Sequence, residues 1–137
     1  MNAPSVPTAD LRGTARRDDR TAPWFDALAG GVLVLRRCAA NGHWARPDAA
    51  ACSRCHDASL EWAPARGGGT VVAVITDHTP VRDGGEPLTL GLVELDEGPW
   101  LHARLLGEPE IGDVVSLVVL TPEPGGEGEP APAFRRA

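Results

Sequence analysis

Apolar and polar residues alternate in four stretches of the second half of the chain. These stretches are separated by turn residues and cover residues 70–78, 88–95, 100–106 and 114–120. Each presents three apolar side chains at every second position: Val71, Ala73 and Ile75; Leu88, Leu90 and Leu92; Leu101, Ala103 and Leu105; Val115, Leu117 and Val119. The period of two predicts four strands with one buried face each, so Leu92 and Leu117 are expected to point into a core.

A fifth strand is expected near the end of the sequence. It would include Phe134 and follow the Pro- and Gly-rich stretch 122–130. Five short strands with one apolar face predict a small closed barrel of the OB type. Residues 63–137 are therefore assigned to one OB-fold domain, and the fold class is mainly β.

The region before the barrel is predicted to contain a polar tail and one short helix. Residues 1–20 have little to bury and are expected to be disordered. Thr21 suits a helix N-cap, Pro23 fits the first turn, and the helix is expected to end at Gly30. Residues 32–35 then predict a short strand.

Three cysteines lie between the predicted helix and the barrel, in a stretch without a long apolar pattern. Cys52 and Cys55 are separated by two residues, and Cys38 precedes Cys52 by fourteen. Two cysteines at the first spacing turn both sulfurs toward one tetrahedral metal, and zinc ribbons use two such pairs. Residues 21–62 are therefore assigned to the helix and a zinc-ribbon-like element.

The first cysteine pair of this ribbon is incomplete. Asn41 stands where a second cysteine is expected, and asparagine is a poor zinc ligand. His43 is favoured as the fourth ligand because it lies on the opposing loop, with His56 as the alternative. The expected zinc ligands are Cys38, His43, Cys52 and Cys55. The competing interpretation is a degenerate ribbon that has lost its metal and persists through packing alone.

Charge and composition narrow the classes of function. The formal net charge is −6, and all 13 basic residues are arginine. An acidic chain of this kind lacks the basic surface of a non-specific nucleic-acid binder. No apolar run reaches the length of a bilayer span, and residues 1–20 have no apolar signal core, so a cytoplasmic location is expected.

Acid–base candidates are few. Asp77 and His78 are adjacent, and His102 lies in another predicted strand. No serine or cysteine nucleophile is placed with them, so a structural role is favoured for all three. No catalytic residue is assigned.

The order of elements resembles a known family. The residues that carry this resemblance are Pro23-Trp24-Phe25 with Leu28 and Gly30, Arg37-Cys38, Cys52 with Cys55, Trp62, Thr70-Val71-Val72, Val93-Glu94-Leu95-Asp96-Glu97-Gly98, Ile111-Gly112-Asp113 with Val115, and Pro132 with Phe134. The chain resembles the rubredoxin-like zinc-ribbon plus OB-fold proteins, formerly a domain of unknown function, which are associated with acyl-coenzyme A. It departs from them at Asn41 and at His56, where glycine is usual.

The resemblance implies a helical hairpin, a ribbon and a barrel in an accessory subunit. Such subunits form hetero-oligomers with thiolase-like, hydratase or aldolase-type partners that carry the catalytic residues. A non-catalytic subunit with a thiolase-like partner is therefore expected. A groove between ribbon and barrel would accept the pantetheine arm of acyl-CoA, and Arg36, Arg37 or Arg66 would meet a CoA phosphate.

Two other functions remain open at this point. A nucleic-acid-binding OB-fold and zinc-ribbon module would show exposed aromatic and basic residues on its strands, and only Trp100, His102 and Arg104 approach this. A free-standing acyl-CoA thioesterase or hydratase would need a nucleophile or a carboxylate–histidine pair, and only Asp77 with His78 offers one.

Overall fold

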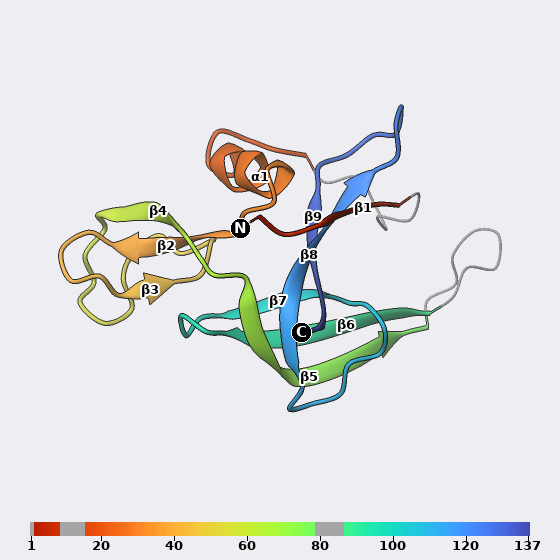
Figure 1. The fold of residues 1–137 in the computed structure, drawn as a ribbon. Helices are drawn as coiled ribbons and strands as arrows, with labels where there is room; N and C mark the ends of the chain where they lie inside the picture. Colours follow the sequence, from red (N-terminus) through yellow and green to blue (C-terminus); the bar gives the residue numbers. More distant parts are fainter. Residues whose placement is uncertain (1, 9–15, 79–86) are drawn as a thin grey trace.

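The computed structural model describes residues 2–8, 16–78 and 87–137. Within them the chain is mainly β, with one helix (Figure 1). The elements are β1 (Ser5–Thr8), α1 (Ala22–Ala29), β2 (Val34–Cys38), β3 (Trp44–Ala45), β4 (Leu60–Pro64), β5 (Gly68–Asp77), β6 (Leu88–Leu95), β7 (Trp100–Leu105), β8 (Val114–Pro122) and β9 (Ala131–Arg136). No helix in the described part is long and apolar enough to cross a membrane.

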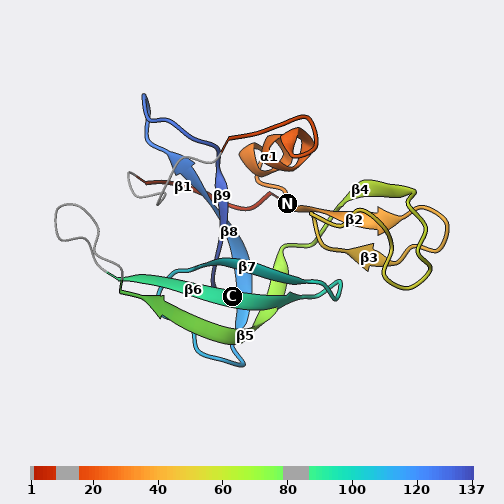
Figure 2. The ribbon, with the colours of Figure 1, turned by 180° about the vertical axis from the view of Figure 1, so that it is seen from behind.

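Strands β5 to β9 close into a barrel. β5 pairs with β6, β6 with β7, β7 with β9, β9 with β8, and β8 returns to β5. All of these pairs are antiparallel except β7 with β9, which is parallel. The predicted five-stranded OB-type barrel is therefore confirmed, and Figure 2 shows it from behind.

Two strands face the barrel differently from their predicted alternation. In β5 the register against β6 shifts between Val71 and Ala73, so Val72 is bulged and the alternation reverses. Val71 packs in the core and Val74 against it, whereas Ile75 is 59% exposed. The prediction that Ala73 and Ile75 share the inner face with Val71 is therefore wrong.

In β6, Gly91, Val93 and Leu95 face the barrel interior. A Cβ atom on Gly91 would lie 2.5 Å from Leu105 Cδ1, and Val93 and Leu95 belong to the core. Leu90 and Leu92 are only half-buried and line outer cavities. The prediction that Leu92 points into the core is wrong, while that for Leu117, which is 4% exposed in the core, is confirmed.

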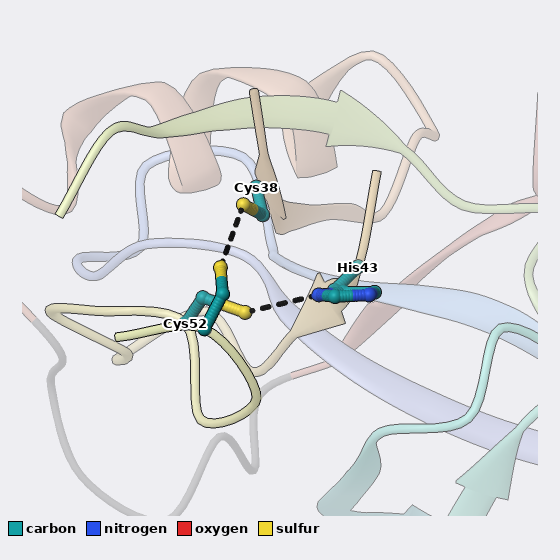
Figure 3. Close-up of side chains that lie close together, drawn as sticks. Cys38, His43 and Cys52 are labelled. Carbon is teal, nitrogen blue, oxygen red and sulfur yellow. Dashed lines mark hydrogen bonds between the residues drawn. The ribbon is translucent and has the colours of Figure 1, made fainter. Parts of the chain in front are cut away.

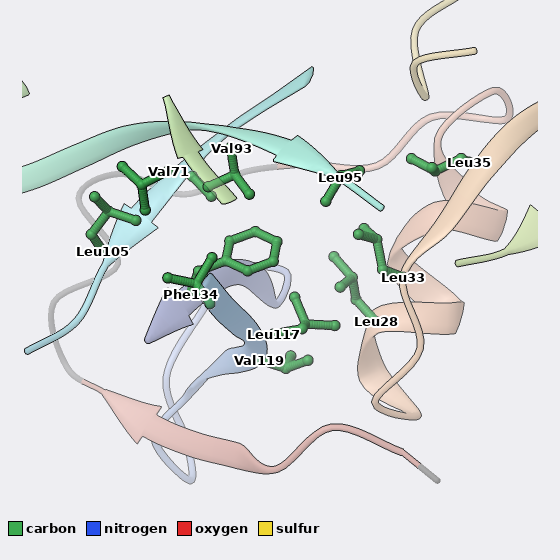
Figure 4. Close-up of a cluster of buried hydrophobic side chains, with 12 residues drawn as sticks. Leu28, Leu33, Leu35, Val71, Val93, Leu95, Leu105, Leu117, Val119 and Phe134 are labelled. Carbon is green, nitrogen blue, oxygen red and sulfur yellow. The ribbon is translucent and has the colours of Figure 1, made fainter. Parts of the chain in front are cut away.

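The barrel core continues into α1 and the start of the ribbon. Phe134, fully buried, lies among valines and leucines from the barrel strands (Figure 4). Leu28 of α1 and Leu33 and Leu35 of the following segment join the same cluster. The helix thus packs against β8 and β9 and fixes where the ribbon leaves the barrel.

The helix begins and ends where the sequence predicts, with Pro23 in its first turn and Gly30 as its C-cap. Thr21 occupies the N-cap position but makes no side-chain capping bond. Asp18 Oδ1 instead accepts the N–H groups of Arg20 and Thr21, and these contacts lower the pKa of Asp18. Where the resemblance implied a helical hairpin, the described residues contain the single helix α1.

Part of the segment expected to be disordered is ordered. β1 pairs in parallel with β8, and the N–H of Ala3 donates to the C=O of Gly31 at 2.8 Å. Residues 5–8 thereby extend the sheet, so the expectation of disorder does not hold for them. Residues 1 and 9–15 lie outside the described part.

Candidate metal centre and ligand groove

The ribbon is a three-stranded antiparallel sheet beside the barrel, with β2 between β3 and β4 (Figure 1). Consecutive arginines on β2 stack on tryptophans of the two flanking strands. Arg36 Cζ lies 4.6 Å from the Trp62 ring centroid, and Arg37 Cζ lies 5.2 Å from that of Trp44. These cation–π contacts link each outer strand to β2.

Two turns of similar geometry carry the candidate metal ligands. The N–H of Gly42 donates to the C=O of Cys38 at 2.7 Å, and the N–H of His56 donates to the C=O of Cys52 at 2.8 Å. Gly42 and His56 both have positive φ, +72° and +61°. This conformation suits glycine, so the second turn places a histidine in backbone geometry that is uncommon for it.

The four expected ligands converge between these turns. Their ligand atoms all lie within 4.8 Å of one another, and the residues are Cys38, His43, Cys52 and Cys55. Cys38 Sγ is 3.4 Å from Cys55 Sγ. Cys52 Sγ is 3.4 Å from His43 Nδ1 (Figure 3). Three sulfurs and one imidazole nitrogen in such a cluster fit a tetrahedral zinc ion.

Local hydrogen bonds favour a thiolate in this cluster. The N–H of Asp57 and contacts with the sulfurs of Cys38 and Cys52 and the side chain of Asn41 lower the pKa of the Cys55 thiol to about 6. At Cys38 the N–H of Asn41 acts in the same direction, but burial and the Cys55 sulfur outweigh it and raise the pKa. A deprotonated sulfur is the form that binds metal.

A polar cavity of about 820 Å³ lies between the ribbon and the β6–β7 hairpin. The ribbon contributes Trp44, Arg46 and Arg54, and the hairpin contributes Glu97 and Trp100. Arg46 and Arg54 are exposed and lie on the loop that also carries Cys52 and Cys55. The loop that would bind the metal therefore also forms one wall of this cavity.

An apolar cavity of about 480 Å³ shares Arg46, Asp48 and Trp100 with the polar one. It lies between α1, the ribbon and the outer face of the barrel. Its apolar lining consists of Trp24, Phe25, Pro47, Trp62, Leu92, Trp100 and Leu101. Together the two cavities form a groove with one arginine-bearing part and one aromatic part, which we call the ribbon–barrel groove.

Known proteins share both the fold and the sequence. Residues 62–121 match the family model described as the ChsH2 C-terminal OB-fold domain. A solved structure described as the Ltp2–ChsH2(DUF35) aldolase contains a chain that is 34% identical, with a TM-score of 0.72. The match covers 91% of this chain and 98% of that one. This chain belongs to the DUF35 family.

Two further proteins are similar to this chain, one in sequence and one in fold. A probable enoyl-CoA hydratase alpha subunit from Thermomonospora curvata is 35% identical over 118 residues, which are 82% of this chain. The chain spans only 36% of the length of that curated relative. A solved DUF35 protein of unknown function from Sulfolobus solfataricus is 13% identical and shares the fold, with a TM-score of 0.59. That match covers 93% of this chain and 90% of the solved chain.

The structure of this DUF35 chain separates the predicted arginines from the groove. Arg36 and Arg37 stack on tryptophans, and Arg66 is an exposed residue whose N–H donates to Glu97. None of the three lines the polar or the apolar cavity of the groove.

The groove instead presents two arginines that the sequence prediction missed, Arg46 and Arg54. The only indication of these arginines in the sequence is their position between His43 and Cys55, in the same loop as the predicted metal ligands. His102 lines the apolar cavity, whereas Asp77 and His78 line neither cavity of the groove.

Proposed function

We propose that this DUF35 chain is a non-catalytic OB-fold subunit that assembles with a thiolase-like partner and helps to position acyl-CoA. The observation that carries the proposal is the match to nearly the whole DUF35 chain of the Ltp2–ChsH2 aldolase. Ribbon and barrel are matched together, because the match covers 91% of this chain and 98% of that one. Catalysis is assigned to the partner.

The ribbon–barrel groove supports the acyl-CoA part of the proposal. Its aromatic part suits the pantetheine arm, which is long and largely apolar, while Arg46 and Arg54 suit phosphate groups at the open end. We rank these two arginines ahead of Arg36 and Arg37, whose guanidinium groups already stack on rings.

The competing functions have less support. An oligonucleotide-binding OB face needs aromatic and basic residues, but the outer face of β5 and β6 carries Ala73, Ile75, Leu90 and Leu92. A hydratase or thioesterase would need an acid–base pair at the substrate, and Asp77 with His78 lies outside the groove. The hydratase relative is also far longer than this chain.

We further propose a structural zinc ion at Cys38, His43, Cys52 and Cys55. Four protein ligands leave no open coordination position, so the ion would fix the ribbon loops rather than take part in a reaction. Through Cys52 and Cys55 it would hold the loop that carries Arg46 and Arg54 against the groove.

The decisive experiment is co-expression with a thiolase-like protein from the same genome. We expect both chains to co-purify and carbon–carbon cleavage or formation on an acyl-CoA to appear only in the mixture. In that complex, replacing Arg46 and Arg54 together with alanine should raise the KM for acyl-CoA, whereas Arg135→Ala should not. Turnover of acyl-CoA by this chain alone, or failure of the purified chains to associate, would contradict the proposal.

A further inference from the structure

The outer side of β5 and β6 carries apolar side chains that do not belong to the barrel core. The register of the two strands places Ala73 opposite Leu92 and Ile75 opposite Leu90. Residues directly opposite on paired strands point to the same side of a sheet, so these four side chains form one surface, which we call the outer apolar face. All four line a cavity of about 420 Å³, and Ile75 is 59% exposed.

The neighbouring strand β7 borders this face with polar and aromatic side chains. The two rows of the face continue on β7 into Arg104 and His102 (Figure 2). Trp100 lies in the next row, and its indole N–H donates to Glu94 Oε2 at 3.0 Å, which orients a ring that is 46% exposed. Arginine and tryptophan are enriched among the residues that dominate binding at protein interfaces. An exposed apolar surface with such a border indicates a protein-binding site.

The outer apolar face is too small to form a stable interface by itself. With strands about 4.8 Å apart and rows about 6.6 Å apart, the face and its border on β7 cover roughly 300 Å². Each partner in a stable interface contributes about 800 Å². A partner must therefore extend beyond the face. The face continues into the aromatic part of the ribbon–barrel groove, because Leu92 and His102 line the cavities on both sides.

From this continuity we propose that the thiolase-like partner docks on the outer apolar face and reaches over Leu92 and His102 to the adjoining end of the groove. This inference rests on the proposed function, in which the groove holds acyl-CoA and the partner carries the catalytic residues. Those residues have to meet the acyl group at an end of the groove, and the outer apolar face borders one end. The partner surface that fits is apolar where it meets Ile75 and Leu90.

A second copy of this chain is the competing occupant. On the same face it would cover Leu92 and His102, and with them the end of the groove that the face borders. The catalytic partner would then have no access to the acyl group from this side. The proposed function therefore favours the thiolase-like partner over a homodimer.

The sequence offers a matched pair of probes for this face, because it contains two isoleucines, Ile75 and Ile111. Ile75 lies on the outer apolar face, whereas Ile111, 68% exposed, lies in the connection between β7 and β8. The full chain with ¹³C-labelled isoleucine δ1 methyl groups gives one NMR signal from each place. Addition of the unlabelled thiolase-like protein should change the chemical shift of the Ile75 signal and leave that of Ile111 unchanged.

Substitution of the same two residues tests their contribution to affinity. Ile75→Asp should raise the Kd for the partner by at least about 30-fold, because it places a charge in an apolar contact. Ile75→Arg should weaken binding as well, since the contact is apolar rather than ionic, and Ile111→Asp should leave the Kd unchanged. Isothermal titration calorimetry measures the Kd, and thermal melts check that each variant is folded.

The outcomes separate this face from the proposed function. Failure of the parent chain to bind the partner would overturn both. Binding that leaves the Ile75 signal in place and the affinity of Ile75→Asp unchanged would keep the proposed function and overturn the docking face. An Ile75 signal that moves with the concentration of this chain alone would assign the face to a second copy and also overturn the proposal.

Discussion

Leu92 and Leu117 have the same side chain but lie in different surroundings. Leu117 is 4% exposed and packs with Phe134 and Val119 inside the barrel. Leu92 is half-buried and lies on the outer surface, where it lines the apolar cavity beside His102. The free energy that each contributes to folding should therefore differ.

Leu117→Ala should destabilise the protein by about 2–5 kcal/mol, because it leaves a cavity in a closed core. Leu92→Ala should cost about 1 kcal/mol or less, because its side chain already borders open space. Urea denaturation of the two variants measures the difference, and each serves as the control for the other. Equal losses of stability would contradict the strand orientation described above.

Among the elements, β6 and β7 show how closely two strands approach inside a small barrel. Gly91 pairs with Ala103, and a Cβ atom on Gly91 would meet three carbon atoms of the Leu105 side chain at 2.5–2.9 Å. Leu105 therefore fills the space above the glycine. Leu105 of β7 can occupy this position only because Gly91 of β6 has no side chain.

Gly91→Ala should destabilise the protein by about 1–3 kcal/mol through overpacking against Leu105. In a Leu105→Ala background the same change should cost much less, since the added methyl group enters vacated space. A double-mutant cycle measured by denaturation should give a coupling of about 0.5–3 kcal/mol. Additive losses would show that the two positions do not face each other.

On the scale of the whole molecule, Arg17 joins segments that are far apart in sequence. Its guanidinium group bonds Glu129, in the connection between β8 and β9, at 2.8 and 2.9 Å, and also pairs with Asp26 of α1. The hydrogen bonds from Arg17 lower the pKa of Glu129. The interaction therefore links the helix to the C-terminal part of the barrel.

Arg17→Ala should lower the melting temperature at neutral pH, and the difference from the parent should shrink in acid. Because the pKa of Glu129 is lowered in the folded state, its contribution to stability is present above the usual glutamate value of about 4.3 and is lost as pH falls below it. Thermal melts at several pH values measure this, with Arg135→Ala as the control for loss of a surface charge. A difference that persists unchanged in acid would contradict the ion pair.

The sequence by itself determined the barrel strands, the helix and the cysteine–histidine cluster of the ribbon. The apolar alternation in β7 and β8 placed Ala103, Leu105 and Leu117 correctly, because each strand is uninterrupted and period two then fixes its buried face. Cys52 and Cys55 revealed the ribbon because their spacing fixes the direction of both sulfurs within one short turn. These are local relations, and local sequence is sufficient for them.

Tertiary structure decided the rest. The bulge at Val72 depends on the pairing of β5 with β6, and Gly91 is required by the Leu105 side chain of β7. The inner faces of β5 and β6 could therefore not be derived from the pattern of either strand alone. Arg46 and Arg54, rather than Arg36, line the groove because the ribbon packs beside the β6–β7 hairpin. Each of these outcomes depends on contacts between segments that are distant in sequence. The pattern of residues within one segment does not predict such contacts.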